Sequence, residues 1–127
     1  MTVVNPRHFI RLGLGDVIRR FAITARALRH YESCGLVEAG RDRLNCRVYD
    51  ATAVERIGLI AALRRAGVSL PQVTEVLGVD EPGRRTEQAL ATLNAREQAL
   101  RDELDRLQDV REALRAVRPR RRGEAAI

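Results

Sequence analysis

The feature that most constrains the fold is a leucine periodicity in the C-terminal third of the chain. Between the turn-like stretch VDEPG and Pro119, the sequence predicts one long helix over residues 84–117. Steps of three and four residues define a heptad seam on this helix, made of Leu90, Leu93, Glu97, Leu100, Leu104, Leu107, Arg111 and Leu114. A stripe this narrow does not bury itself alone, so the helix is expected to pair with a second helix.

The two polar positions of the seam favour an antiparallel homodimer. In an antiparallel pair centred near Asp102, Glu97 and Arg111 of opposite chains occupy neighbouring layers, close enough to form an ion pair. In a parallel pair each of them would face its own copy, and the like charges would repel. The alternative is a helix that packs back on its own domain.

The composition indicates a small helical protein. The 127 residues suggest one compact domain with an appended helix, and an aromatic content of 3% leaves a core of aliphatic side chains, which favours helices. No window approaches the roughly 20 apolar residues of a membrane span, and the N-terminal extension, residues 1–11, shows no signal peptide. The two cysteines are expected to be reduced thiols. These features predict a cytoplasmic protein.

The net charge of +6 is concentrated at the two ends of the sequence. Residues 1–78 contain 12 arginines and 7 acidic residues, whereas residues 79–117 contain 7 arginines and 9 acidic residues. This distribution suits an anionic partner for the N-terminal part. The tail, residues 118–127, adds 4 arginines and 1 acidic residue and is expected to be disordered. A flexible arm that adds non-specific DNA affinity is the alternative for this tail.

Residues 15–34 have the pattern of two short helices separated by a tight break. Thr24 is a good N-cap for the second helix, and Gly35 follows it where a left-handed residue commonly ends a helix. On the second helix, Leu28 and Tyr31 share the side that is expected to face inward. Two helices joined in this way have the dimensions of a helix-turn-helix.

The segment that follows predicts a hairpin and two further helices. Residues 36–49 alternate in a way that favours a short hairpin, with Gly40 and Asp42 expected in the turn. Asp50 and Ser69 are each placed to cap a helix. The expected result is a helix pair, a hairpin and two more helices before the long C-terminal helix.

This order of elements, together with its residues, resembles the MerR family of bacterial transcription regulators. The matching motifs are LGDVI at 14–18, ITARALRHYESCGL at 23–36 and NCRVY at 45–49. The resemblance implies a mainly α fold, with a winged helix-turn-helix DNA-binding domain over residues 12–78. It also implies that the helix over 84–117 is a dimerisation helix in an antiparallel coiled coil.

Two departures from the family pattern lie close to the expected DNA contacts. His30 stands where a tyrosine is usual, and Asn45 with Cys46 replaces Gly-Tyr in the wing. Operator sequence and wing geometry are therefore expected to differ from those of typical members. Because histidine is the side chain whose charge changes near neutral pH, operator affinity is expected to depend on pH through His30.

The residues expected to contact double-stranded DNA lie on both short helices and in the wing. Thr24 and Arg26 are the candidates for reading bases, because an arginine near the start of a recognition helix can bond guanine through two hydrogen bonds. The candidates for contacts to phosphates and for the wing are Arg19, Arg20, Arg29, His30, Tyr31, Arg41, Arg43, Asn45 and Arg47. For any one arginine, a solvated surface charge is the alternative.

A metal site made of His30, Cys34 and Cys46 is the rival interpretation of the same stretch. A closed zinc site would still lack a fourth ligand, and Cys46 belongs to a separate hairpin. Ile23, Ala27, His30 and Cys34 form one helical stripe, which is typical of a partly buried helix edge, with Cys34 acting as a small hydrophobe. No metal or other cofactor is expected.

What the resemblance implies for function is a homodimer on a palindromic promoter operator. Such a dimer distorts the DNA so that RNA polymerase engages both promoter elements. Only RRRGEAAI follows Pro119, so no effector-binding domain is expected, and control through a protein partner or through abundance is the hypothesis.

Two alternatives from other classes stay open. One is a DNA-architectural or excisionase-like winged-helix protein, and the other is a coiled-coil protein that recruits a partner. An enzyme is not expected, because the sequence offers no nucleophile–base pair and no phosphate-cradling glycine loop.

Overall fold

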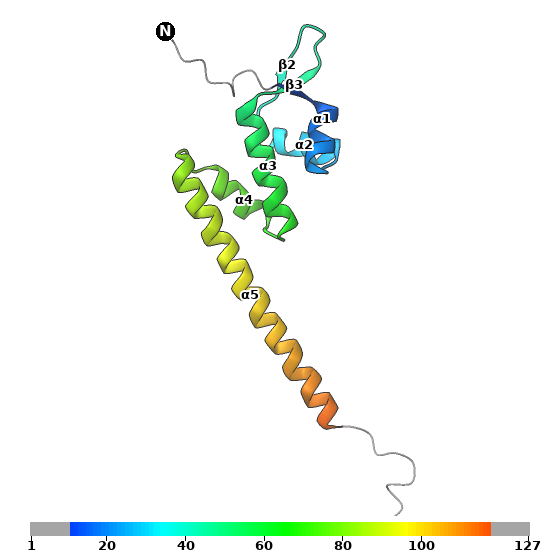
Figure 1. Ribbon diagram of the computed structural model, residues 1–127, viewed down its shortest axis with the longest axis vertical. Helices are drawn as coiled ribbons and strands as arrows, with labels where there is room; N and C mark the ends of the chain where they lie inside the picture. Colours follow the sequence, from blue (N-terminus) through cyan, green and yellow to red (C-terminus); the bar gives the residue numbers. More distant parts are fainter. Residues whose placement is uncertain (1–10, 118–127) are drawn as a thin grey trace, which may run out of the picture. The chain divides into compact units, whose positions relative to one another are not determined.

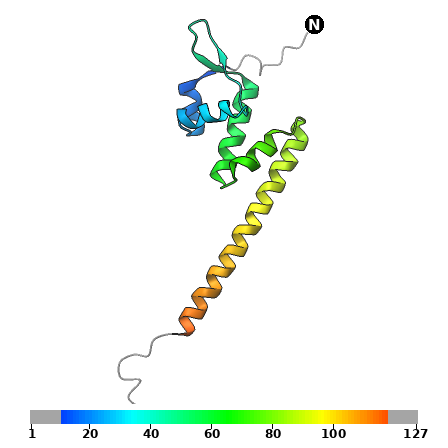
Figure 2. The same cartoon turned by 180° about the vertical axis from the view of Figure 1, so that it is seen from behind.

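The computed structural model describes residues 11–117, and the chain divides into two compact units at residues 93 and 94. The basic tail at 118–127 and all but the last residue of the N-terminal extension lie outside the described residues. Figures 1 and 2 show the described part from opposite sides. In chain order the elements are β1 (Leu12–Gly13), α1 (Leu14–Phe21), α2 (Ala25–Ser33), β2 (Gly40–Arg41), β3 (Arg47–Tyr49), α3 (Ala51–Arg65), α4 (Leu70–Leu77) and α5 (Pro82–Ala116).

Side-chain caps set where three of the helices begin. The Thr24 hydroxyl accepts a hydrogen bond from the backbone N–H three residues later, at 3.0 Å, at the start of α2. The Asp50 carboxylate does the same at 2.8 Å at the start of α3. Ser69 forms a capping box with Gln72 at the start of α4. The helix starts predicted from these residues are confirmed.

Glycines in the left-handed region follow α2 and α3. Gly35 has φ +76° and Gly67 has φ +82°, a conformation that costs glycine little. After α2, the backbone N–H of Leu36 donates to the carbonyl of Tyr31 at 3.0 Å, which closes the helix end. The chain therefore reverses sharply after the second helix, as the sequence predicts.

The wing belongs to a three-stranded antiparallel sheet in the order β1–β3–β2. The hairpin of β2 and β3 confirms the prediction, but β1 was not anticipated. In β1, Leu12 pairs with Tyr49. A two-residue strand shows no alternation in sequence, so only its pairing with β3 reveals it.

The turn of the hairpin lies further along the chain than predicted. Gly40 is in β2, where it pairs with Val48, so its assignment to the turn was wrong. The Asp42 carboxylate instead organises the reversal, because Oδ1 accepts from the backbone N–H groups of Leu44 and Cys46, each at 2.9 Å. This side-chain bonding replaces the glycine turn that the sequence suggested.

The core of the first unit surrounds α3. Helices α1 and α4 both contact α3 (Figure 1). Strand β3 is followed directly by α3, with Asp50 between them as the N-cap. The largest fully buried side chains are almost all aliphatic, as the composition predicts: Tyr49, Leu28, Ile57, Ile60, Leu63, Val17, Val68, Val73 and Val76. Burial of each such side chain stabilises the fold by about 1.5–3 kcal/mol relative to exposure.

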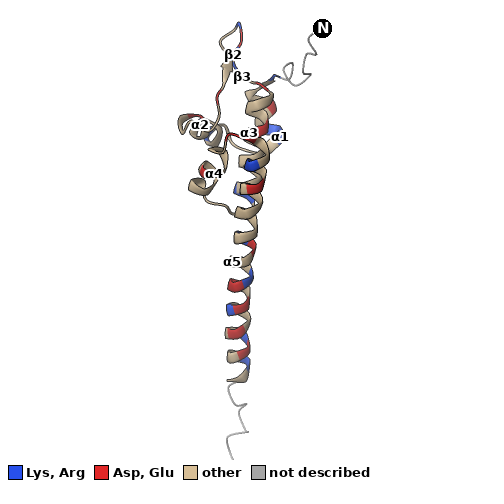
Figure 3. Cartoon of the chain, turned by 90° about the vertical axis from the view of Figure 1, so that its left-hand side faces the viewer, with Lys and Arg blue, Asp and Glu red and all other residues tan. Residues whose placement is uncertain are grey.

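Helix α5 changes character along its length. Ala89 is buried and Leu93 packs against the core of the first unit, so the first turns of α5 belong to that core. From Glu97 to Val117 every residue is exposed, and Figure 3 shows acidic and basic residues along this part of the helix. The mainly α fold with a helix-turn-helix, a wing and a long C-terminal helix is thus confirmed. Within residues 11–117, no helix is long and apolar enough to cross a membrane.

Candidate nucleic-acid interface

Helix α2 presents arginines on the face opposite its buried side. Leu28 is fully buried and Tyr31 is 8% exposed, which confirms the predicted inward side. Arg26 and Arg29 are exposed on α2. Arg26 lies in the first turn, where an arginine can reach base edges in the major groove. The burial of Tyr31 leaves only a small part of its side chain for the predicted phosphate contact.

The other predicted residues of the helix pair have partners that fix their positions. Thr24 is exposed but its oxygen caps α2, so any base contact uses a hydroxyl that is already oriented. Arg19 forms an ion pair with Asp16 at 2.8 Å, and both side chains are largely exposed. The guanidinium of Arg20 lies over the Phe21 ring at 5.6 Å. These arginines are held at the surface of α1, where phosphates can replace water.

The wing carries two exposed arginines near its tip. Arg41 donates from Nη1 to the carbonyl of Asn45 at 3.3 Å, and Arg43 is exposed in the turn. Asn45 adopts φ +61°, the left-handed conformation that asparagine tolerates better than most residues. Its neighbour Leu44 is 84% exposed and was not singled out in the sequence. No pattern could have distinguished this leucine from a core residue, since its exposure follows from the turn.

Arg47 differs from the other wing arginines. Its side chain is 25% exposed, and its Nε lies 3.3 Å from Oε2 of Glu32, whose side chain is 15% exposed. The same Nε is buried and makes no hydrogen bond, so the contact is an ion pair. Arg47 is therefore not the freely solvated cation that its place in the wing suggested.

Glu32 is the contact residue at this candidate interface that the sequence analysis did not single out. Its Oε1 accepts a hydrogen bond from the Tyr49 hydroxyl at 2.6 Å. Burial, with further contributions from the hydrogen bond and charge of Glu32, raises the pKa of Tyr49 above its ordinary range. A signal for Glu32 was its position one turn after Leu28, on the inward side of α2.

Cys46 lies in the hairpin, as expected, but Cys34 does not occupy the site expected of it. Cys34 is exposed, so its assignment to a partly buried helix edge was wrong. The reason is that α2 ends at Ser33, and Cys34 lies in the turn. Its Sγ is 3.7 Å from Nε2 of His30, while Cys46 is exposed in the wing. Among residues 11–117, no three histidine, cysteine or acidic side chains are grouped to hold a metal ion.

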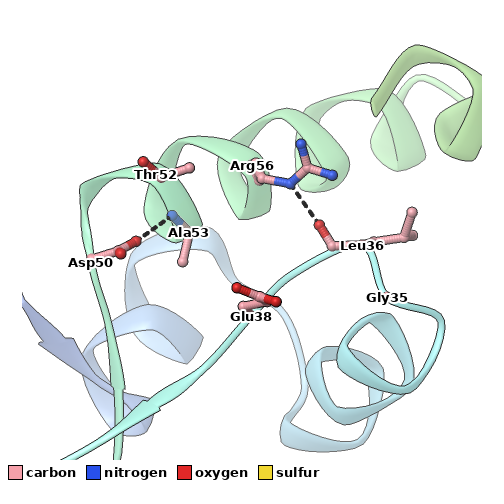
Figure 4. A pocket seen from close by; sticks show the side chains of 7 residues that line it. All are labelled: Gly35, Leu36, Glu38, Asp50, Thr52, Ala53 and Arg56. Carbon is pink, nitrogen blue, oxygen red and sulfur yellow. Dashed lines mark hydrogen bonds between the residues drawn. The ribbon is translucent and has the colours of Figure 1, made fainter. Parts of the chain in front are cut away.

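A polar hollow lies between the segment after α2 and the start of α3 (Figure 4). Arg56 spans it and donates from Nε to the carbonyl of Leu36 at 2.7 Å. Asp50 on its rim is already used as the cap of α3. The bond from Arg56 therefore connects α3 to the segment that follows α2.

Two family models match the chain. One, described as "MerR HTH family regulatory protein", matches residues 13–78, which is more than half of the sequence. The other, described as "MerR, DNA binding", matches residues 54–117. The chain belongs to the MerR family. The family resemblance drawn from the sequence motifs is confirmed.

Two similar proteins come from bacteria. The nodulation protein NolA of Bradyrhizobium elkanii is 35% identical over 78 residues, which cover 61% of this chain and 35% of NolA. The HTH-type transcriptional regulator AdhR of Bacillus subtilis is 32% identical over 97 residues, covering 76% of this chain and 65% of AdhR. The chain thus spans about a third to two thirds of these relatives.

Solved structures of MerR proteins share the fold. HiNmlR, described as a MerR family regulator lacking the sensor domain and bound to promoter DNA, superposes with a TM-score of 0.58 and 22% identity. The matched part covers 79% of this chain and 80% of HiNmlR. A MerR family regulator from Bacillus cereus gives a TM-score of 0.64 at 18% identity, covering 84% of this chain and 79% of that one. At these identities the likeness shows the fold alone.

Proposed function

We propose that this chain is a sequence-specific transcription regulator that binds a palindromic promoter operator as a homodimer. The observation that carries the proposal is the exposure of arginines on α2, the proposed recognition helix, and in the wing, while the side of α2 that carries Leu28 and Tyr31 is buried. Membership of the MerR family supports this assignment. HiNmlR, with the same fold and bound to promoter DNA, supports it as well. Such a protein acts in the cytoplasm, at the nucleoid.

The arginines divide into two roles. Arg26, in the first turn of α2, reads a base edge, with the Thr24 hydroxyl beside it. The exposed cations Arg19, Arg20, Arg29, Arg41 and Arg43 bind phosphates and fix the orientation of the domain on the duplex. Base contacts give sequence preference, whereas phosphate contacts give affinity that falls with salt. His30, exposed on α2, is placed to add a contact near the same phosphates.

The dimer is proposed to form through α5. Five apolar side chains on its outer part are between 43% and 69% exposed in the single chain, namely Leu100, Leu104, Leu107, Val110 and Leu114. Leu90, at 54%, continues the row. Water contact on so many leucines is unfavourable, and a second copy of the helix removes it. The separation of the two DNA-binding domains then sets the spacing of the half-sites.

The dimer is proposed to distort its operator. Two DNA-binding domains at a fixed separation favour DNA that is bent or untwisted to fit them. Additional phosphate contacts offset the free energy of deforming the DNA. Distortion between the two promoter elements changes how well RNA polymerase engages both. Control of transcription then follows from the shape of the DNA.

Two substitutions test the assignment of roles on operator DNA selected from random sequence by the protein. We expect Arg26→Gln to lower discrimination at one base pair of each half-site by about 1–3 kcal/mol and to leave the salt dependence nearly unchanged. We expect Arg20→Gln to weaken binding to all sequences equally and to lower the salt slope by about one per lost phosphate contact. Equal effects of both variants on every sequence would contradict the proposal.

A further inference from the structure

One carboxylate joins the recognition helix to the wing. Glu32, in the last turn of α2, accepts a hydrogen bond from the Tyr49 hydroxyl at 2.6 Å. Its second oxygen lies 3.3 Å from Nε of Arg47. Arg47 and Tyr49 are the first and last residues of β3, the central strand of the sheet. Both ends of the central strand are thus tied to one side chain of the recognition helix.

The wing meets the helices mainly through its central strand: β3 contacts α1 and α3, and its Tyr49 is fully buried in the core. Strand β2 has two residues, β3 has three, and the turn between them is exposed throughout. A hairpin this short is at best marginally stable alone. The hydrogen bond to Glu32 also joins residues 17 positions apart, which makes it a long-range contact. Glu32 therefore supplies a hydrogen bond and an ion pair that connect β3 directly to α2.

Glu32 also offsets a repulsion inside the hairpin. Arg41 of β2 lies directly opposite Arg47 of β3 in the strand register, and like charges opposite one another destabilise a sheet. Glu32, Arg41 and Arg47 line the same open hollow beside the wing. One carboxylate near two guanidinium groups reduces their mutual repulsion.

We infer that Glu32 is a positioning residue for DNA binding, which holds the wing at the angle where its arginines and those of α2 meet the same duplex. This inference rests on the proposed function. Glu32 touches no DNA in this account. It acts through Arg47 and Tyr49, and its removal separates the wing's phosphate contacts from those of the recognition helix.

The direction in which one substitution changes operator affinity distinguishes a positioning role of Glu32 from an effect of its charge alone. Glu32→Gln removes a negative charge from a protein of net charge +6, so electrostatics alone would strengthen DNA binding. Loss of a hydrogen-bonded, ion-paired carboxylate is expected instead to weaken operator affinity about tenfold. Glu38→Gln is the matched control, an exposed glutamate on the rim of the same hollow, and is expected to bind as tightly as the parent or slightly more tightly.

A double-mutant cycle with the wing tip tests how Glu32 acts. In the parent, Arg43→Ala is expected to weaken binding about three- to tenfold and to lower the salt slope by about one. In the Glu32→Gln protein, the same Arg43→Ala change is expected to have little further effect, because the wing no longer meets its phosphate. Tyr49→Phe, which keeps the ring but removes the donor, is expected to give an intermediate loss.

Amide hydrogen exchange provides a readout that needs no DNA. In Glu32→Gln, exchange in Arg47–Tyr49 is expected to be about tenfold faster than in the parent, with exchange in α4 unchanged. If the parent selects no DNA sequence, the proposed function fails, while the exchange result still decides whether Glu32 holds the wing. Tighter DNA binding by Glu32→Gln, independent effects of Glu32→Gln and Arg43→Ala, or unchanged wing exchange would each overturn the inference.

Discussion

Arg56, in the middle of α3, donates from Nε to the main-chain carbonyl of Leu36 at 2.7 Å (Figure 4). Its Nη1 lies 3.4 Å from the carbonyl of Leu77 at the end of α4. Burial, together with the nearby charge of Arg85, lowers the pKa of Arg56, although an arginine stays charged at neutral pH. The central helix therefore holds, through one guanidinium, the segment that follows the recognition helix.

Replacement of Arg56 is expected to destabilise the domain. Arg56→Met keeps an unbranched apolar chain but removes both donors, which leaves the Leu36 carbonyl without its charged partner. We expect the free energy of unfolding, measured by urea titration, to fall by about 1.5–3 kcal/mol. Arg84→Met, at an exposed position in the first turns of α5, is the control and is expected to change stability by less than about 0.5 kcal/mol. Similar losses in the two variants would contradict this role.

Substitution of the N-caps Thr24 and Asp50 allows an effect on stability to be distinguished from an effect on DNA binding. Thr24→Ala and Asp50→Ala each remove the side-chain oxygen that accepts a hydrogen bond from a backbone N–H in the first turn of a helix. Each is expected to lower the free energy of unfolding by about 1 kcal/mol. Only Thr24→Ala is expected also to weaken operator binding under conditions where both variants are folded, because Asp50 lies outside the proposed interface. Equal losses of affinity would show that Thr24 acts only as a cap.

The sequence allowed the helices to be placed because their signals are local. The capping hydrogen bonds of Thr24, Asp50 and Ser69 join residues only a few positions apart, and Gly35 acts equally locally. The residues that allow a helix end to be predicted are therefore the same residues that form it. The inward side of α2 followed from its period in the same way. These elements did not depend on long-range information.

The features that the sequence could not reveal depend on contacts between distant residues. Strand β1 exists because Leu12 pairs with Tyr49. The pairing of Glu32 with Arg47 likewise depends on how the wing packs on α2, and no local pattern separates a paired arginine from a solvated one. Cys34 was misplaced because a helical stripe was extended one residue beyond the end of α2. Beyond a helix end, helical spacing no longer predicts which side chains are buried, and helix ends are hard to place from sequence.

Because the Tyr49 hydroxyl is buried, we expect the free energy of unfolding to fall at high pH. The pKa of Tyr49 is raised in the folded state, so the folded protein keeps this proton better than the unfolded chain does. Its stabilising contribution is complete below the ordinary tyrosine pKa of about 10 and declines as the pH rises above it. The sequence has no lysine, so few other groups titrate in that range.

Urea titrations between pH 9 and pH 12 measure this effect. The free energy of unfolding of the parent is expected to fall above pH 10 by up to about 1.4 kcal/mol per pH unit from this group. Tyr49→Phe is expected to start from a lower stability and to show a shallower decline. Parallel pH dependences in the two proteins would show that Tyr49 carries no such linkage.

Cysteine cross-linking tests the proposed orientation of α5 in the dimer. In a background with Cys34→Ser and Cys46→Ser, two proteins are made, one with Leu90→Cys and one with Leu114→Cys. Antiparallel pairing places position 90 opposite position 114 of the other copy. We therefore expect disulfide-linked dimers when the two proteins are mixed and oxidised, and little cross-linking of either alone. Efficient cross-linking of each protein with itself would indicate parallel pairing instead.

The central claim is that two copies of this domain read a symmetric sequence within a promoter. The most direct measurement is DNase footprinting of the purified protein on DNA fragments that it binds from the genome of the bacterium that encodes it. We expect one protected region with dyad symmetry, located between the two promoter elements and lost in Arg26→Gln. Protection that does not depend on sequence, or a protected site without symmetry, would contradict it.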